Sequence, residues 1–395
     1  MAFNFKLISL KKSLNGLPEH SAEEEIHDLL RENRNNWANE QELDQPEDGL
    51  HEVPPQKLGQ NMEDMELIDF SGKKHQYIKK DCKIIGFDES SKTCSGTYSK
   101  LSVYKFGEGQ IAYKNDKYDK DLTMFEPMIA YIEDDDHKLK IYKSIIKNFI
   151  ATIKDNFYVN PLQGSIDQLE KWYKSKFKKE LEERIGNSDF RRPSIKHIIN
   201  RIRTSDEILK SLIRIRDISN WGKKKNCIFL GDGIHMFQHF EFPPQKFTEF
   251  FNKFIKEFDI KYYSFSKECK LRDKKGKFIV LYWKKRIKSR AFLIKLPKNL
   301  HFSNSQTFIV RLVEGGPVLR FDLPEFYSLS DAISILKNLI PYSPYGYPLA
   351  LSGAHKASTL LPSEQRKVDG KFLNLQYQKS TKNKAKVSRE GVLPY

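Results

Sequence analysis

Cysteine is scarce in this chain, and long apolar runs are missing. The four cysteines among 395 residues are far apart and form no CxxC pair, which excludes a zinc ribbon and a disulfide framework. No apolar run approaches the length of a membrane-spanning helix, and the first 14 residues lack the apolar core and cleavage site of a secretory signal. We therefore expect a protein of the reducing cytoplasm that makes no contact with a membrane.

Acidic residues are outnumbered by basic ones. Lys and Arg total 68 against 52 Asp and Glu, for a net charge of +16, and the excess lies downstream of about residue 75. Basic clusters interleaved with aromatic residues are typical of nucleic-acid grooves, but solvated faces of a lysine-rich protein explain them equally well. The clusters are Lys171 to Arg192, Lys223-Lys224-Lys225, Lys270 to Lys277 and Lys284-Lys285-Arg286.

Composition divides the chain into three parts. Residues 1–80 form an acidic arm and linker, with one possible helix at Ser21 to Trp37 and a proline-containing linker at Asp44 to Gln60. Residues 366–395 form a basic tail of low apolar content. Residues 81–365 between them carry the apolar periodicity of a folded domain, with a helical insertion at about 120–218.

The central part alternates strand and helix patterns. The expected strands are Lys83 to Asp88, Lys100 to Phe106, a Gly107-Glu108-Gly109 turn leading to Gln110 to Lys114, Cys227 to Gly233, Ile260 to Ser266, Phe278 to Trp283, Ala291 to Lys295, Thr307 to Val313 and Val318 to Leu323. The expected helices are Leu139 to Ile153, Ser165 to Arg184, Ser194 to Arg216, Pro244 to Phe258, Ser330 to Leu339 and Tyr347 to Leu361.

Two apolar strands each stop on a carboxylate, the first at Asp88 and the second at Asp232. Burying an ionised carboxylate is costly unless a cation or hydrogen-bond donor receives it, and hard divalent cations prefer oxygen ligands. The two strands could therefore converge on one metal. Each aspartate alone has the plainer explanation of a turn residue. The order of elements matches an α/β fold with a ribonuclease-H-like mixed sheet flanked by helices.

Four short motifs follow one another between about residues 81 and 365. They are Gly86 to Ser90, Leu230 to Gly233, Ser264 to Lys267, and Gly346-Tyr347-Pro348 to Ala354-His355. In this order they resemble the motifs of the NurA nucleases, and the last is similar to that family's C-terminal motif. Arg311 and Arg320 lie in a segment similar to the family's paired strands before the last helix. Each motif is weak alone, but the order and the Tyr-to-His spacing are fairly specific.

The resemblance implies roles for particular residues. Asp88, Asp232 and His355 would bind metal, together with a helical carboxylate for which Glu207 is the first choice and Asp206 and Asp217 are competitors. The implied catalytic residues are Asp88, Glu207, Asp232, Tyr347, His355 and Lys267, with Lys267 as a phosphate contact. The expected DNA contacts are Lys223, Lys224, Lys225 and Arg320.

The activity implied by the resemblance is hydrolysis of phosphodiester bonds in DNA by a divalent-metal-dependent deoxyribonuclease. Two Mn²⁺ or Mg²⁺ ions would activate a water and stabilise the leaving oxygen. The resemblance further implies a homodimer that works with a HerA-type hexameric ATPase translocase, in DNA end processing or in antiviral defence.

The motifs also leave an alternative open. Glu89 stands where the family usually has Gly, which adds a charge beside the proposed metal. The alternative is a catalytically inactive DNA-binding clamp or scaffold subunit of the translocase complex.

Overall fold

The computed structural model describes most of the central part of the chain. The described residues are 65, 67–69, 82–95, 99–114, 117–125, 127–133, 138–177, 195–233, 244–267, 271–273, 275–287, 290–296 and 305–370. The helix and the linker expected in the N-terminal arm lie outside them, as do residues 371–395 of the tail.

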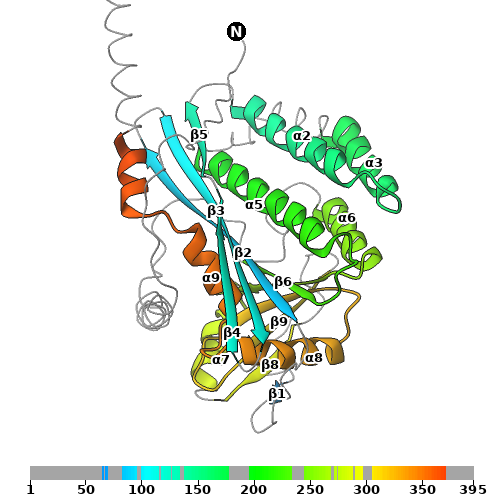
Figure 1. Ribbon diagram of the computed structural model, residues 1–395, viewed down its shortest axis with the longest axis vertical. Helices are drawn as coiled ribbons and strands as arrows, with labels where there is room; N and C mark the ends of the chain where they lie inside the picture. The colour runs from blue at the N-terminus through cyan, green and yellow to red at the C-terminus, as the bar shows by residue number, and fades with distance from the viewer. Residues whose placement is uncertain are drawn as a thin grey trace, which may run out of the picture.

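Strands and helices alternate along the described chain (Figure 1). The strands are β1 (Leu67–Asp69), β2 (Lys83–Ser95), β3 (Ser99–Lys114), β4 (Lys117–Met124), β5 (Met128–Glu133), β6 (Cys227–Asp232), β7 (Lys261–Ser266), β8 (Phe292–Lys295), β9 (Ser305–Arg311) and β10 (Leu319–Pro324). The helices are α2 (Lys138–Phe157), α3 (Gln163–Trp172) with the π-helical turn η3 (Tyr173–Phe177), α5 (Ile195–Ser219), α6 (Pro244–Glu257), α7 (Ile279–Arg286), α8 (Leu329–Leu339) with the 3₁₀ turn η4 (Ile340–Tyr342), and α9 (Leu349–Ser358).

The described strands form one mixed sheet. Its order is β1-β8-β9-β10-β7-β6-β2-β3-β4, and β5 pairs with β3 beside β4. Strand β6 is parallel to both of its neighbours, β2 and β7, whereas the other pairs are antiparallel. The expected mixed α/β sheet with flanking helices is therefore present.

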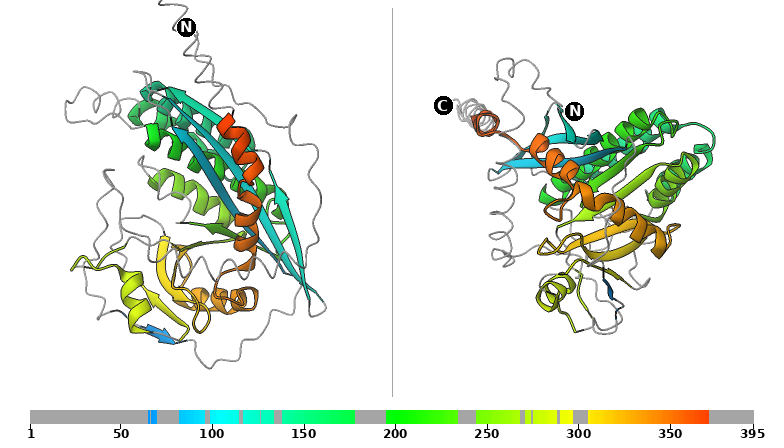
Figure 2. Two further views of the ribbon diagram at one scale, coloured as in Figure 1. Left: turned by 90° about the vertical axis from the view of Figure 1, so that its left-hand side faces the viewer. Right: turned by 60° about the horizontal axis from the view of Figure 1, so that its bottom comes forward.

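Helices cover both faces of the sheet because apolar residues occupy both sides of its central strands. Ile85 and Phe229 point into a core with α2, α3, α5 and α6, whereas Ile84 and Leu230 point into a second core with α8 and α9. Figure 1 shows α5 and α9 on opposite sides of β2 and β3, and Figure 2 shows α9 lying along these two strands. None of the described helices is long and apolar enough to cross a membrane.

Strand β2 is longer than its sequence pattern predicted. It continues past Asp88 to Ser95 and stays paired with β3 over its whole length, so Asp88 does not end the strand. What ends near Asp88 is the pairing with β6, whose last partners are Phe87 and Gly231. Asp88 therefore lies on β2 just beyond its last pairing with the parallel strand β6.

The predicted turn at Gly107-Glu108-Gly109 is wrong, because β3 runs straight through these residues. A Cβ atom on Gly109 would lie 2.3 Å from the carbonyl oxygen of Ala350, and one on Gly107 would lie 2.3 Å from that of Ala354. On the neighbouring strand, a Cβ atom on Gly86 would lie 2.5 Å from Ala350. The glycines thus allow the backbone of α9 to approach the sheet closely.

Two other segments differ from expectation. Phe278 to Trp283 was predicted as a strand from its aromatic and β-branched residues, but it lies in α7, where Ile279, Val280 and Trp283 are buried and Leu281 is exposed. That burial pattern has the period of a helix. The helical region expected from about residue 120 begins at Lys138, because β4 and β5 precede it.

Segments near both ends of the described chain contact the sheet. Strand β1, within the predicted arm, pairs antiparallel with β8 at the sheet edge. Residues 362–370 are helical, so the helix includes the first residues of the predicted tail. Asp369 of this helix forms an ion pair of 2.8 Å with Lys92 of β2, and the buried Glu364 pairs with Lys105 of β3 at 3.1 Å.

Candidate functional site

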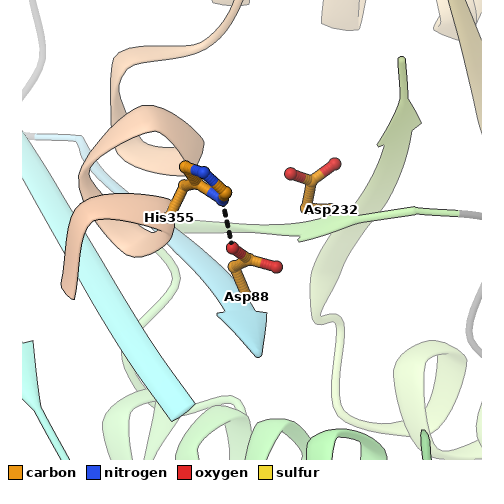
Figure 3. A group of neighbouring side chains, drawn as sticks. All are labelled: Asp88, Asp232 and His355. Carbon is orange, nitrogen blue, oxygen red and sulfur yellow. Dashed lines mark hydrogen bonds and ion pairs between the residues drawn. The ribbon is translucent and has the colours of Figure 1, made fainter. Parts of the chain in front are cut away.

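Asp88 and Asp232 lie beside each other at the point where β6 ends. Alternation along each strand places both side chains on the α9 face of the sheet, because Ile84, Ile228 and Leu230 of the same faces pack in the core with α9. Asp88, Asp232 and His355 each offer one potential ligand atom, and the three atoms lie within 4.8 Å of one another (Figure 3). The structure thus brings these three predicted residues together.

Helix α9 delivers His355 to the two aspartates. Pro348 is its N-cap residue, and the fixed φ of proline suits the start of a helix. The Nδ1 atom of His355 donates to Oδ2 of Asp88 at 2.8 Å, because a carboxylate can only accept. Ser358, three residues later on the same side of α9, donates its hydroxyl to the same oxygen at 3.0 Å. Ser90 of β2 in turn donates to the carbonyl oxygen of Ser358, which fastens this turn to the strand.

Tyr347 and Lys267 border the same site. Tyr347 precedes α9, so it does not share a helical face with His355 as the spacing predicted. It is only 4% exposed, and its hydroxyl interacts with the Asp232 carboxylate. The ammonium of Lys267, one residue past the end of β7, lies 4.5 Å from the centre of the Tyr347 ring. Its positive charge acts on both Asp88 and Asp232.

Burial and neighbouring charges shift the pKa values of the ionisable groups at the site. Burial raises the pKa of Asp232 to about 6, and the neighbouring charge of Asp88 adds to this rise. Burial alone would also raise the pKa of Asp88, but the hydrogen bond and charge of His355 hold it below its usual value. The same hydrogen bond raises the pKa of His355. Two carboxylates held together by one imidazole need additional positive charge when both are ionised.

Glu207 lies on the helix that covers the other face of the sheet. It lies on α5, is 21% exposed and does not belong to the group of three. Burial raises the pKa of Glu207 to about 8, Arg203 opposes this rise, and the charges of Asp88 and Asp232 add to it. Of its competitors, Asp206 forms an ion pair with Lys210 and Asp217 pairs with Arg216 in the last turn of α5.

Glu89 points away from the side of β2 that carries Asp88, although it follows Asp88 directly. Strand alternation turns its side chain toward α5, where it is fully buried and lies 3.6 Å from the Lys210 ammonium. Burial and the charge of Asp206 raise the pKa of Glu89 well above its usual value. The added charge that the sequence suggested beside Asp88 therefore lies on the opposite face.

Lys223, Lys224 and Lys225 are exposed in the loop before β6 and border an open cavity of about 730 Å³ together with Lys83 and Gln110. They precede Cys227 at the start of β6, whereas Asp232 ends this strand five residues after Cys227, or about 17 Å farther along an extended strand. The structure does not bring these lysines to the three-residue site.

Arg320 does not reach the surface at which DNA contact was expected. It is 3% exposed and pairs with the buried Asp322 at 2.9 Å. Arg311 is similarly buried, with its guanidinium 5.3 Å from the Phe292 ring. These two arginines stabilise the interior of the sheet, because a buried guanidinium needs partners within the protein.

The group of Asp88, Asp232 and His355 fits a divalent cation. Two carboxylate oxygens and one imidazole nitrogen are a donor set that suits Mn²⁺, and Mg²⁺ accepts the carboxylates. Burial and, after it, the charge of Asp88 raise the pKa of Asp232, and a bound cation would favour its ionised form against both. Glu207 does not belong to this group, although the charges of both aspartates act on it.

Sequence reasoning missed residues that support the site without belonging to a motif. Ser358 follows His355 by three residues, a spacing that places both side chains on one side of a helix and could have indicated it. Arg203 donates to the carbonyl oxygen of Glu89 at 3.1 Å, and no sequence pattern marks that contact.

Comparison with known proteins supports one family. Residues 270–359 match the sequence model of the NurA domain, so the expected resemblance to NurA is confirmed for this part of the chain. The matched part contains Tyr347 and His355, whereas Asp88, Glu207 and Asp232 precede it. A search of curated proteins found no match.

Solved NurA structures resemble the chain over most of its length. The NurA nuclease from Sulfolobus solfataricus is 16% identical with a TM-score of 0.39, and the alignment covers 90% of this chain and 98% of that one. A NurA structure with manganese is 9% identical with a TM-score of 0.33, covering 88% and 98%. A NurA structure bound to dAMP and manganese is 12% identical with a TM-score of 0.29, covering 90% and 95%.

Proposed function

We propose that this protein is a divalent-metal-dependent deoxyribonuclease that hydrolyses phosphodiester bonds. One observation carries the proposal: His355, within the segment that matches the NurA domain, donates to Asp88 at 2.8 Å, and both lie beside Asp232. The two aspartates lie outside the matched segment. The contact therefore connects the matched segment with residues that lie outside it.

Each side chain of the site has a role in this chemistry. Asp88, Asp232 and His355, with Glu207, would hold Mn²⁺ or Mg²⁺, two ions in the complete site. Bound ions of this kind activate a water and stabilise the leaving oxygen. The Lys267 ammonium offsets negative charge on the phosphate oxygens of the substrate. Tyr347, buried against Asp232, orients that carboxylate or the attacking water.

The proposal extends to fold and partners on the strength of the NurA-like segment. The parallel pair of β2 and β6, with an aspartate on each, supports a ribonuclease-H-like arrangement. We infer a cytoplasmic homodimer that receives DNA from a HerA-type hexameric ATPase translocase, in end processing or in antiviral defence.

We assign Lys223, Lys224 and Lys225 to DNA binding at a distance from the reaction. Their cavity lies about 17 Å from Asp232 along β6 and is bordered by four lysines. A nucleic-acid backbone held there would be bound by charge alone, because ammonium groups recognise phosphates irrespective of sequence.

A cleavage assay with an Asp232→Asn variant tests the proposed activity. Labelled linear and circular DNA are incubated with the full-length protein and Mn²⁺, Mg²⁺ or a chelator. We expect the variant to lose at least about 100-fold in cleavage rate, equivalent to about 2.7 kcal/mol of transition-state stabilisation, because the amide cannot hold the ion as a carboxylate does. Asp217→Asn is the matched control, since Asp217 is a carboxylate that pairs with Arg216 on α5.

Unchanged cleavage by the Asp232→Asn variant would refute the assigned site. If the wild-type protein binds DNA in a salt-dependent way but cleaves no DNA at any Mn²⁺ or Mg²⁺ concentration, the protein is a non-catalytic clamp or scaffold and the proposed activity is wrong.

A further inference from the structure

Arg203 connects the two parts of the chain that carry acidic residues of the site. Its Nη1 atom donates to the carbonyl oxygen of Glu89 at 3.1 Å, and Glu89 directly follows Asp88 on β2. The same nitrogen lies 4.0 Å from Oε2 of Glu207, one helical turn later on α5. The Arg203 guanidinium thus lies between β2, which carries the proposed ligand Asp88, and the side chain of the proposed ligand Glu207.

Other contacts already hold the body of α5 against the sheet. Arg214 forms two hydrogen bonds to the buried Glu108 of β3, at 2.7 and 3.0 Å. Lys210 lies 3.6 Å from the buried Glu89 carboxylate. Arg203, Lys210 and Arg214 are spaced by seven and four residues, so they share one side of the helix. Lys210 and Arg214 already hold α5 against the sheet. Attachment of the helix therefore does not by itself require Arg203.

The direction of the Glu207 carboxylate depends on its contacts, because a glutamate side chain has three rotatable bonds. Its contact with Arg203 restricts these rotations, since Arg203 is itself bonded to the carbonyl oxygen of Glu89 on β2. Among the described residues, Arg203 is the basic residue that forms an ion pair with Glu207.

We propose that Arg203 is a positioning residue that holds the Glu207 carboxylate toward Asp88, Asp232 and His355, so that a divalent cation finds four protein ligands instead of three. This inference rests on the proposed metal site. The inference adds Arg203 as the residue that orients Glu207, the proposed ligand on α5.

A double-mutant cycle on Mn²⁺ affinity tests the proposal. Isothermal titration calorimetry with Mn²⁺ alone is applied to the full-length wild type, Arg203→Met, Glu207→Gln and the double variant. Residues that orient metal ligands typically change metal affinity by 10- to 100-fold. We therefore expect Arg203→Met to weaken Mn²⁺ binding by about 10-fold or more in the wild-type background, but by less than about twofold when Glu207 is already Gln.

Two control variants separate positioning from general stability. Arg216→Met removes another arginine of α5, which bonds to the carbonyl oxygen of Asn156 at 3.0 Å and pairs with Asp217, and it should leave Mn²⁺ affinity unchanged. Arg203→Lys keeps the charge and should recover part of the lost affinity. If Arg203→Met does not fold, as judged by thermal unfolding, Arg203→Lys enters the same cycle and must weaken binding only when Glu207 is present.

The outcomes distinguish this proposal from the one on which it rests. An equal loss of affinity with and without Glu207, or no loss at all, overturns the positioning role and leaves the metal site intact. A wild-type protein that binds no Mn²⁺ overturns the metal site, and the role of Arg203 with it.

Discussion

Ser358 has a small side chain that forms a hydrogen bond within the candidate site. Its hydroxyl donates to the Asp88 oxygen that also accepts from His355, and the residue is fully buried. Hydrogen bonds to charged groups contribute about 1.5–3 kcal/mol when buried. The serine therefore restricts the Asp88 carboxylate to one orientation.

We expect Ser358→Ala to lower the rate of Mn²⁺-dependent DNA cleavage by about tenfold, because Asp88 loses one of the two hydrogen bonds that orient it. The measurement is kcat/KM on a labelled linear duplex. The control is Ser352→Ala. Ser352 lies six residues before Ser358 on α9, has no described contact with Asp88, and its variant should cleave at the wild-type rate. Equal rates for both variants would contradict the orienting role of Ser358.

Single residues show which parts of the site were predictable. Asp88, Asp232 and His355 were predicted from short motifs, and the structure brings them together, although their chemical roles remain predictions. The position of Glu89 was not predictable from composition, because its face depends on where β2 continues beyond Asp88. Arg203 acts through a backbone carbonyl, so nothing in its neighbouring sequence indicates its partner.

At the scale of elements, the position of α9 depends on glycines in the sheet beneath it. The hypothetical Cβ of Gly109 would lie 2.3 Å from the Ala350 oxygen and 2.6 Å from the Ala354 nitrogen. Both atoms belong to the helix backbone, which cannot rotate away as a side chain can. The contact allows His355 to reach Asp88, because both residues extend from these closely packed elements.

We expect Gly109→Ala to destabilise the protein by about 1–3 kcal/mol, as overpacking does in well-packed interiors, and to reduce cleavage because α9 moves away from β2 and β3. Urea unfolding gives the change in stability. Gly164→Ala is the matched control: it lies on α3 with no atom within 4 Å of the added Cβ, and alanine favours helix, so it should stabilise by up to about 1 kcal/mol. A Gly109→Ala protein as stable as wild type would show that α9 is loosely packed.

The same glycines explain where sequence reasoning about elements failed. Gly107 and Gly109 are two residues apart, a pattern that predicts a hairpin turn when only local preferences are considered. Their actual role comes from a helix about 240 residues later, which the local pattern cannot report. Helices α2, α5, α6 and α8 were predicted within a few residues, because their apolar spacing is strong along the chain itself.

At the scale of the whole molecule, the cationic cavity and the acidic site lie at opposite ends of the parallel strands. Lys83 and Lys223 border the cavity at the start of β2 and β6, whereas Asp88 and Asp232 lie where the pairing of these strands ends. DNA that contacts both regions must therefore extend along the protein for at least about 17 Å, or five stacked nucleotides at 3.4 Å each.

Replacing Lys223, Lys224 and Lys225 together by Gln should weaken DNA binding without changing the cleavage rate at saturating DNA. Each lost phosphate contact lowers the slope of log K against log salt by about 0.9, so the slope should fall by up to about 2.7. Fluorescence anisotropy at several salt concentrations measures it. A slope equal to that of the wild-type protein would show that these three lysines do not contact DNA.

The hydrogen bond between His355 and Asp88 joins residues 267 positions apart in the chain. A ribosome must therefore synthesise the chain through residue 355 before the two side chains can meet. A nascent or prematurely terminated chain that ends after Asp232 but before residue 355 contains both aspartates and lacks the histidine. His355 is thus the last of the three clustered residues to be translated, so an incomplete copy of the chain cannot assemble the candidate site.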